Sequence, residues 1–154
     1  MNKQFTLKAV KPLAGTELQL SFADGEVMRV DVAPIVKRSP VLRPLLDAAV
    51  FKRAKLGEWG GSVTWGADVL ELAADNLRAR AIEQAGGFSH EVVLEWVHRH
   101  GMTQQAAADA LGLSRRMLAY YLSGEKPVPR TVALACLGWD AAAERNDYRF
   151  ALAA

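Results

Sequence analysis

Residues 102–124, MTQQAAADALGLSRRMLAYYLSG, decide the fold of the second half of the chain. Thr103 can cap a helix over residues 104–111, because its hydroxyl oxygen can accept a hydrogen bond from a free backbone N–H of the first turn. Small and aliphatic residues at helical spacing form the apolar face of this helix: Ala107, Ala108 and Leu111. Gly112 allows the left-handed conformation in which a helix ends without a steric penalty. The stretch therefore predicts a short helix followed by a sharp turn.

A second short helix is expected to begin after Ser114, which can cap it in the same way. Its inward face carries apolar residues at helical spacing: Leu118, Tyr121 and Leu122. Polar and amphipathic residues lie on its other faces: Arg115, Arg116, Tyr120 and Ser123. Gly124 ends it. Because Ala107 and Ala108 are small, the two helices can approach closely at a steep angle, which is the arrangement of a helix-turn-helix.

This stretch resembles the lambda-repressor-like helix-turn-helix of the Xre family. The resemblance rests on residues at the family's pattern positions in both helices and the turn: Gln104, Ala108, Gly112 and Leu118. Tyr121 departs from the pattern, since an aliphatic residue is usual at that position. The resemblance implies that the chain binds double-stranded DNA and reads the major groove with the helix that starts at Ser114.

The candidate DNA-binding residues are Gln104, Ser114, Arg115, Arg116, Tyr120 and Ser123. Gln104 is expected to donate to a phosphate near the start of the first helix. Of Arg115 and Arg116, one is expected to read a base and the other to bind a phosphate, and an arginine can fork onto O6 and N7 of guanine. A homodimer is also expected, because a single recognition helix contacts only a few base pairs. The alternative is a plain helical hairpin with solvated arginines.

The first 33 residues predict a three-stranded antiparallel meander. Apolar residues alternate along its three segments: Phe5, Leu7 and Ala9, then Leu18, Leu20 and Phe22, then Met28, Val30 and Val32. Ala14-Gly15 and Asp24-Gly25 supply the turns, and Pro34 is expected to close the meander.

Residues 39–80 predict further short elements. Ser39-Pro40 is expected to start a helix that covers the sheet with an apolar face: Val41, Leu42, Leu45 and Leu46. A second hairpin is expected from residues 51–59 and 62–65 around Gly60-Gly61, with Val63 and Trp65 on one face. Another helical stretch begins near Ala73.

Residues 5–80 resemble a small bacterial family of domains of unknown function that is found in toxin–antitoxin loci, sometimes beside a helix-turn-helix. The resemblance rests on Leu20, Phe22, Asp24-Gly25-Glu26, Asp31, Leu46, Phe51, Trp65, Gly66, Ala67 and Asp68. It implies a protein partner or an assembly role for this half of the chain, and an antitoxin-like function for the whole.

Gly86-Gly87 separates two expected domains, an α+β domain over residues 1–85 and an all-α helix-turn-helix domain over residues 88–154. In the second domain, Ser89 is expected to cap a first helix with Val92, Val93, Trp96 and Val97 on its apolar face. Pro127 and Pro129 stop the recognition helix. A fourth helix is expected to bury Val132, Ala135, Cys136 and Trp139, and the alternating tail residues Tyr148, Phe150 and Leu152 are expected to dock as a strand.

The local distribution of charge is more informative about anionic partners than the net charge of the chain. The net charge of +2 is too small to indicate nucleic acid by itself. Between Arg115 and Arg130, however, four basic residues face one acidic residue, and between Arg29 and Lys55 seven basic residues face two acidic ones. The second run is expected to be a solvated face, with a second anionic contact as the alternative. No apolar run is long enough to span a bilayer and no secretory signal is evident, so cytoplasmic localisation is expected.

Catalysis and metal binding find little support in the sequence. Asp68 is expected to cap a turn rather than act as a catalytic carboxylate, because no nucleophile or second carboxylate is spaced beside it. With Cys136 as the single cysteine, the histidines at 90, 98 and 100 are expected on a helix surface rather than in a metal site, and the thiol is expected to be buried. No cofactor is expected. The sequence favours a DNA-binding transcriptional regulator, and the alternative is a protein-interaction or antitoxin-like inhibitor module that does not bind DNA.

Overall fold

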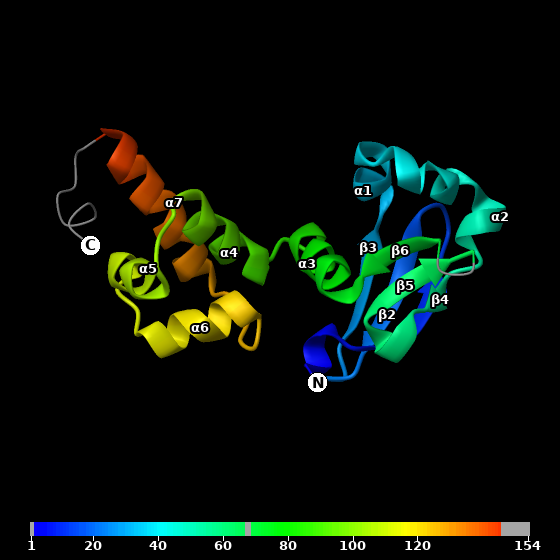
Figure 1. Ribbon diagram of the computed structural model, residues 1–154, viewed down its shortest axis with the longest axis horizontal. Helices are drawn as coiled ribbons and strands as arrows, with labels where there is room; N and C mark the ends of the chain where they lie inside the picture. Colours follow the sequence, from blue (N-terminus) through cyan, green and yellow to red (C-terminus); the bar gives the residue numbers. More distant parts are fainter. Residues whose placement is uncertain (1, 67–68, 146–154) are drawn as a thin grey trace. The chain divides into compact units, whose positions relative to one another are not determined.

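The computed structural model describes residues 2–66 and 69–145, and the chain divides into two compact units, Met1–Ala85 and Gly86–Ala154 (Figure 1). The first unit holds antiparallel sheets and short helices, and the second holds helices in its described part. The expected α+β class is therefore confirmed. The expected roles of Ala67 and Asp68, and the strand expected around Tyr148, Phe150 and Leu152, fall outside the described residues.

The predicted meander is present as an antiparallel sheet of three strands, β1 (Leu7–Pro12), β2 (Glu17–Phe22) and β3 (Val27–Asp31), in the order β1-β2-β3. Alternation places Leu18, Leu20 and Phe22 in the core, each at most 3% exposed. At the Asp24-Gly25 turn, the Asp24 carboxylate accepts a hydrogen bond from the backbone N–H of Glu26 at 3.1 Å. Phe5 was expected in the first strand but lies in a 3-10 helix, η1 (Lys3–Phe5).

Three short helices follow the meander: α1 (Ala33–Arg38), the 3-10 helix η2 (Pro40–Leu46) and α2 (Ala48–Phe51). Pro34 therefore lies in the first turn of a helix rather than ending the sheet. The expected apolar face of the next helix is wrong in part, because Leu42 and Leu45 are buried whereas Val41 and Leu46 are 68% and 54% exposed. A 3-10 helix has three residues per turn, so only residues i and i+3 share a face, and Pro44 cannot donate the hydrogen bond that a regular α-helix needs.

A second antiparallel sheet has the order β4-β5-β6, with β4 (Lys55–Leu56), β5 (Ser62–Trp65) and β6 (Leu70–Ala73). The expected pairing before Ser62 is present, but its first strand has two residues, because α2 extends to Phe51 and the 3-10 helix η3 (Glu58–Gly60) occupies the turn. The strand β6 was not expected from the sequence. Val63, Trp65 and Leu72 join the first sheet in one hydrophobic core.

The helix α3 (Ala74–Gln84) begins where expected and packs on this core through Leu77 and Ala81. Arg78 fastens it to the first sheet, pairing with the Asp24 carboxylate at 2.8 Å and lying 4.8 Å from the centre of the Phe22 ring. Burial raises the pKa of the Asp24 carboxyl, but the hydrogen bond from Arg78, backbone hydrogen bonds and the Arg78 charge together outweigh burial and lower it. The Asp24–Arg78 pair therefore stabilises the first unit only while Asp24 is ionised.

The second unit contains α4 (His90–Arg99), α5 (Gln104–Leu111), α6 (Arg115–Ser123) and α7 (Arg130–Arg145). Its core is formed by Val93, Trp96, Ala107, Ala108, Leu118, Tyr121, Val128, Val132, Ala133 and Cys136. Ala135, expected in this core, is exposed, and Ala133 is buried in its place. The contacts of Trp139 and Asp140 with α4 set the rotation of α7, and in that rotation Ala135 faces solvent. None of the described helices has the length and apolar character needed to cross a membrane.

Candidate nucleic-acid interface

The expected N-caps of α5 and α6, and the turn that joins the two helices, are confirmed. The Thr103 hydroxyl accepts a hydrogen bond from the Ala106 N–H at 3.1 Å, and the Ser114 hydroxyl accepts one from the Met117 N–H at 3.1 Å. Gly112 takes the left-handed conformation with φ 68°. Each cap satisfies a backbone N–H that its helix leaves free, so both helices begin at defined residues.

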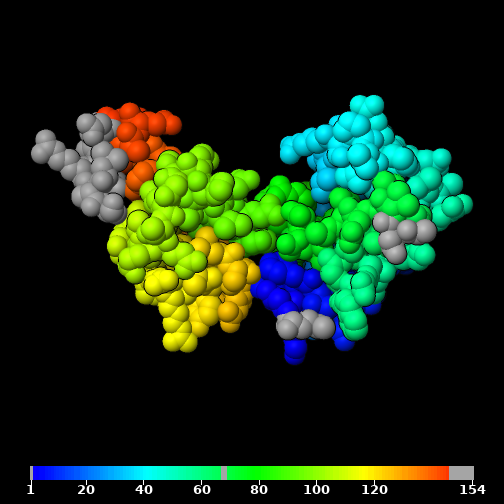
Figure 2. Space-filling view, in the orientation of Figure 1, coloured from blue at the N-terminus to red at the C-terminus, as the bar shows by residue number. Residues whose placement is uncertain are grey.

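Small residues bring the two helices together. Ala107, Ala108 and Leu118 are completely buried, and Tyr121 is 8% exposed. Tyr121, which departs from the resembled family's pattern, thus serves as a core residue. Leu111 was expected to be buried but is half-buried at the edge of this core. The buried faces leave the N-terminus of α6 free at the surface of the unit, and Figure 2 shows the α6 segment, in yellow, as an exposed part of that surface.

Of the candidate residues, Gln104 lies on α5, and the others lie on α6 or at its N-cap. Gln104 is the first residue of α5, and Arg115 is the first residue of α6. Gln104, Ser114, Arg115, Arg116 and Ser123 are exposed, whereas Tyr120 is half-buried. No hydrogen bond or ion pair within the described part of the chain holds the Arg115 side chain. Its guanidinium is therefore available to a ligand.

The structure brings Arg116 and Tyr120 together, one helical turn apart on α6. Arg116 Nε donates to the Tyr120 hydroxyl at 2.9 Å, and the Arg116 guanidinium lies 5.6 Å from the ring centre. Ser123, by contrast, uses its hydroxyl locally, donating to the Tyr120 carbonyl at 3.3 Å and accepting from the Glu125 N–H at 3.3 Å. The Ser123 hydroxyl therefore hydrogen-bonds to the backbone at the C-terminal end of α6.

Lys126, which was not among the candidate residues expected from the sequence, also contacts Tyr120. Its Nζ lies 4.7 Å from the centre of the Tyr120 ring, and its backbone N–H donates to the Tyr120 carbonyl at 3.2 Å. Gly124, with φ 74°, turns the chain back at the end of α6 and makes this possible. We refer to Arg116, Tyr120 and Lys126 as the Tyr120 cluster. The sequence shows an excess of positive charge between Arg115 and Arg130, but only the turn after α6 shows which of these cations contact the same ring.

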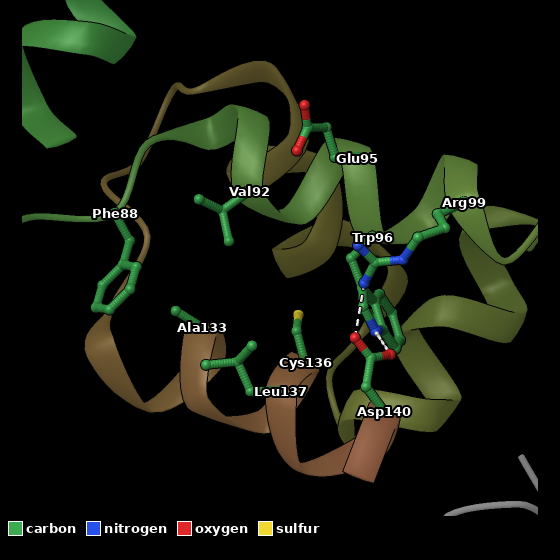
Figure 3. A pocket seen from close by; sticks show the side chains of 9 residues that line it. All are labelled: Phe88, Val92, Glu95, Trp96, Arg99, Ala133, Cys136, Leu137 and Asp140. Carbon is green, nitrogen blue, oxygen red and sulfur yellow. Dashed lines mark hydrogen bonds and ion pairs between the residues drawn. The ribbon is translucent and has the colours of Figure 1, made fainter. Parts of the chain in front are cut away.

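A second feature of the same unit is a shallow hollow of about 190 Å³ between α4 and α7 (Figure 3). Apolar side chains gather at one end and charged ones at the other. The residues that line it are Phe88, Val92, Glu95, Trp96, Arg99, Ala133, Cys136, Leu137 and Asp140. Its volume lies below the range of about 300–1,000 Å³ that is typical of small-molecule sites, so it suits a side chain of a partner better than a cofactor.

Asp140 cross-links α7 to α4 at the charged end of this hollow (Figure 3). Its carboxylate accepts hydrogen bonds from Trp96 Nε1 at 3.0 Å and from the Arg99 guanidinium at 2.6 Å, and it lies 2.7 Å from His100 Nε2. The His100 ring also packs on Trp139, with 4.7 Å between ring centres. His100 is exposed, as expected for a surface histidine, and it is also held by a carboxylate that is distant in sequence.

The Cys136 thiol lies at the floor of the same hollow and is buried, as expected. Burial, with a smaller contribution from the Asp140 charge, raises its pKa to about 11. The thiol is therefore protonated at neutral pH and is a poor nucleophile. The described residues contain no group of three or more side chains that could hold a metal ion.

Comparison with known proteins gives matches to one family and one solved structure. No curated protein matches this chain. The chain is similar to the crystal structure of "Putative DNA Binding Protein NE0471 from Nitrosomonas europaea ATCC 19718", with 46% identity over 92% of each chain and a TM-score of 0.82. Residues 7–83 match the family described as "Protein of unknown function (DUF2442)". The chain therefore belongs to the DUF2442 family.

Proposed function

We propose that this protein is a sequence-specific DNA-binding transcriptional regulator that reads the major groove with α6. The observation that carries the proposal is the capped pair α5 and α6, joined at Gly112, with exposed Arg115 and Arg116 at the start of the second helix. Helix-turn-helix proteins use this end of the recognition helix to contact base edges. The resemblance to the Xre family and the name of the similar solved protein support the proposal. Neither name is that of an enzyme.

Arg115 is the residue assigned to the base. It is exposed and free of partners within the described residues, so both edges of its guanidinium can fork onto O6 and N7 of a guanine. Gln104, at the start of α5, is assigned to a phosphate, because the free N–H groups of a helix N-terminus favour an anion there. The Ser114 hydroxyl oxygen caps α6, and its hydrogen is assigned to a phosphate of the DNA backbone.

The test compares Arg115→Ala with the wild-type protein by fluorescence anisotropy. The probes are a duplex that the wild-type protein selects from a randomised pool and a duplex of scrambled sequence. Loss of one bidentate base contact should cost about 1–3 kcal/mol on the selected duplex and relax the preference at one position. Arg43→Ala, at an exposed arginine of the first unit, is the matched control and should bind like the wild type.

A homodimer is part of the proposal. Leu137, which lines the hollow between α4 and α7, is 59% exposed, and Leu94 of α4 and Leu134 of α7 are each 47% exposed. A two-fold pair would place two copies of α6 about 34 Å apart, one helical turn of DNA. Sedimentation should therefore show a dimer, and Leu137→Glu should weaken it. A wild-type protein that sediments as a monomer, both free and with the selected duplex, contradicts this part of the proposal.

The second candidate is a protein-interaction or antitoxin-like module. Trp59, on the turn before β5, favours this candidate because its large apolar side chain is 82% exposed and could pack on a partner. Its backbone has φ 57°, which is unusual for a residue other than glycine. The low net charge of +2 also fits a protein partner of the first unit. The same anisotropy experiment separates the candidates. Unchanged duplex affinity in both Arg115→Ala and Arg116→Ala would favour the protein-interaction module.

A further inference from the structure

Two cations are held against one aromatic ring at the surface of the second unit. The Arg116 guanidinium and Lys126 Nζ lie 5.6 Å and 4.7 Å from the centre of the Tyr120 ring. No carboxylate pairs with either cation in the part of the chain that the structure describes. The two like charges on one ring repel each other, and an anion that contacts both cations would offset this repulsion.

The hydrogen bonds of the Tyr120 cluster leave suitable donors free. Arg116 donates through Nε to the Tyr120 hydroxyl oxygen, so its two terminal nitrogens and the phenolic hydrogen are unused. The Lys126 ammonium adds further donors. A tetrahedral oxyanion with several acceptor oxygens matches such a set better than a single carbonyl does.

The backbone brings Lys126 back to the end of α6, beside Tyr120. The left-handed Gly124 ends α6, and the Lys126 N–H then bonds the Tyr120 carbonyl at 3.2 Å. Pro127 follows and restricts the conformation of Lys126. The backbones of Tyr120 and Lys126 are therefore fixed relative to each other.

We propose that the Tyr120 cluster is a clamp for one phosphate of the DNA backbone. This inference rests on the proposed DNA binding and deepens it. Arg116 and Lys126 share a single phosphate and Tyr120 aligns them, which leaves Arg115 as the base-reading arginine. A backbone phosphate carries no sequence information, so the clamp sets the register of α6 in the groove but not its base preference.

The test measures the salt dependence of duplex binding for Arg116→Gln, Lys126→Gln and the double variant. Each phosphate contact contributes about 0.9 to the slope of log affinity against log salt concentration. Because the two cations share one phosphate, the slope for the double variant should be smaller by about 0.9 than that for the wild type. Over a fourfold rise in salt concentration, the affinity of the wild type should therefore fall about 3.5-fold more than that of the double variant. Two separate phosphate contacts would give a loss of about 1.8, and this result would overturn the clamp.

Tyr120→Phe examines the ring and the hydroxyl separately. The phenyl ring keeps the packing and the cation contacts but removes the hydrogen bond to Arg116. It should weaken selected and scrambled duplexes by the same factor and leave the slope near the wild-type value. A change in base preference would contradict the assignment to phosphate. Lys52→Gln, at an exposed lysine of the first unit, is the control, and circular dichroism checks that each variant is folded.

The outcomes distinguish the clamp from the proposed function. A wild-type protein that binds neither duplex refutes both. A wild-type protein that binds, with the double variant keeping the full slope, refutes the clamp and leaves DNA binding intact. If the double variant binds duplex normally but loses binding to polyglutamate, the cluster belongs to an acidic protein partner and the clamp is wrong.

Discussion

Replacing Asp140 by alanine is expected to loosen α7 from α4. The Asp140 carboxylate contacts Trp96 and Arg99 on α4 and His100 at the C-cap of that helix. Asp140→Ala removes all three contacts but leaves a residue with high helix propensity. The effect should therefore report the interhelical contacts rather than the intrinsic stability of α7.

The three contacts contribute unequally. Trp96 is 2% exposed, so its indole N–H would be left buried without an acceptor, which costs about 1–3 kcal/mol. The Arg99 side chain is 60% exposed, and an ion pair in solvent contributes at most about 1 kcal/mol. The hydrogen bond to His100 adds about 0.5–1.5 kcal/mol. The free energy of opening should fall by about 2–4 kcal/mol in total, mainly through Trp96.

Cys136 provides the assay, because it is the only cysteine in the chain and is 2% exposed on the buried face of α7. A thiol reagent should modify it only when the unit opens, and the rate then follows the population of the open state. Asp140→Ala should accelerate labelling about 30- to 700-fold, since each 1.4 kcal/mol corresponds to a factor of ten.

Two matched variants make this experiment decisive. Glu144→Ala removes an exposed carboxylate from the same helix and should leave the labelling rate nearly unchanged. Asp140→Asn keeps an acceptor for Trp96 but removes the charge, so its effect should lie between those of the other two variants. If Asp140→Ala labels no faster than Glu144→Ala, the carboxylate does not hold the helices together.

Two further predictions concern the turn and the first unit. Gly112→Ala should destabilise the second unit by about 1–2 kcal/mol, because the left-handed φ of 68° is unfavourable with a side chain, although an added Cβ would meet no atom within 4 Å. Gly138→Ala, inside α7 and equally open, should instead stabilise by about 0.5–1 kcal/mol, and equal effects in thermal unfolding would contradict this reasoning. The pKa of the Asp24 carboxyl is lowered below its ordinary value of 3.8, so its pairing with Arg78 stabilises the first unit above that pH and is lost as the pH falls through the folded value. Denaturant midpoints measured against pH should therefore fall less steeply on the acid side in Asp24→Asn than in the wild type, and parallel curves would contradict the linkage.

The sequence determined those features that depend on residues near one another in the chain. Thr103 and Ser114 each cap a helix through an N–H three residues away, and Gly112 ends a helix through its own backbone freedom. The meander follows from alternation of apolar residues and the Asp24-Gly25 turn. The exposure of Arg115 also follows from its position on α6, whereas its contact with a base stays a prediction.

The tertiary structure decided what depends on distant residues or on competition between local geometries. The pattern of residues 40–46 fits an α-helix, but Pro44 and the burial of only Leu42 and Leu45 select a 3-10 helix. Lys126 joins the Tyr120 cluster only because the chain reverses at Gly124. Asp140 meets Trp96 across 44 residues of sequence. A single side chain gives no sign of such a partner, because the contact exists only after both helices have packed and water has been excluded from between them.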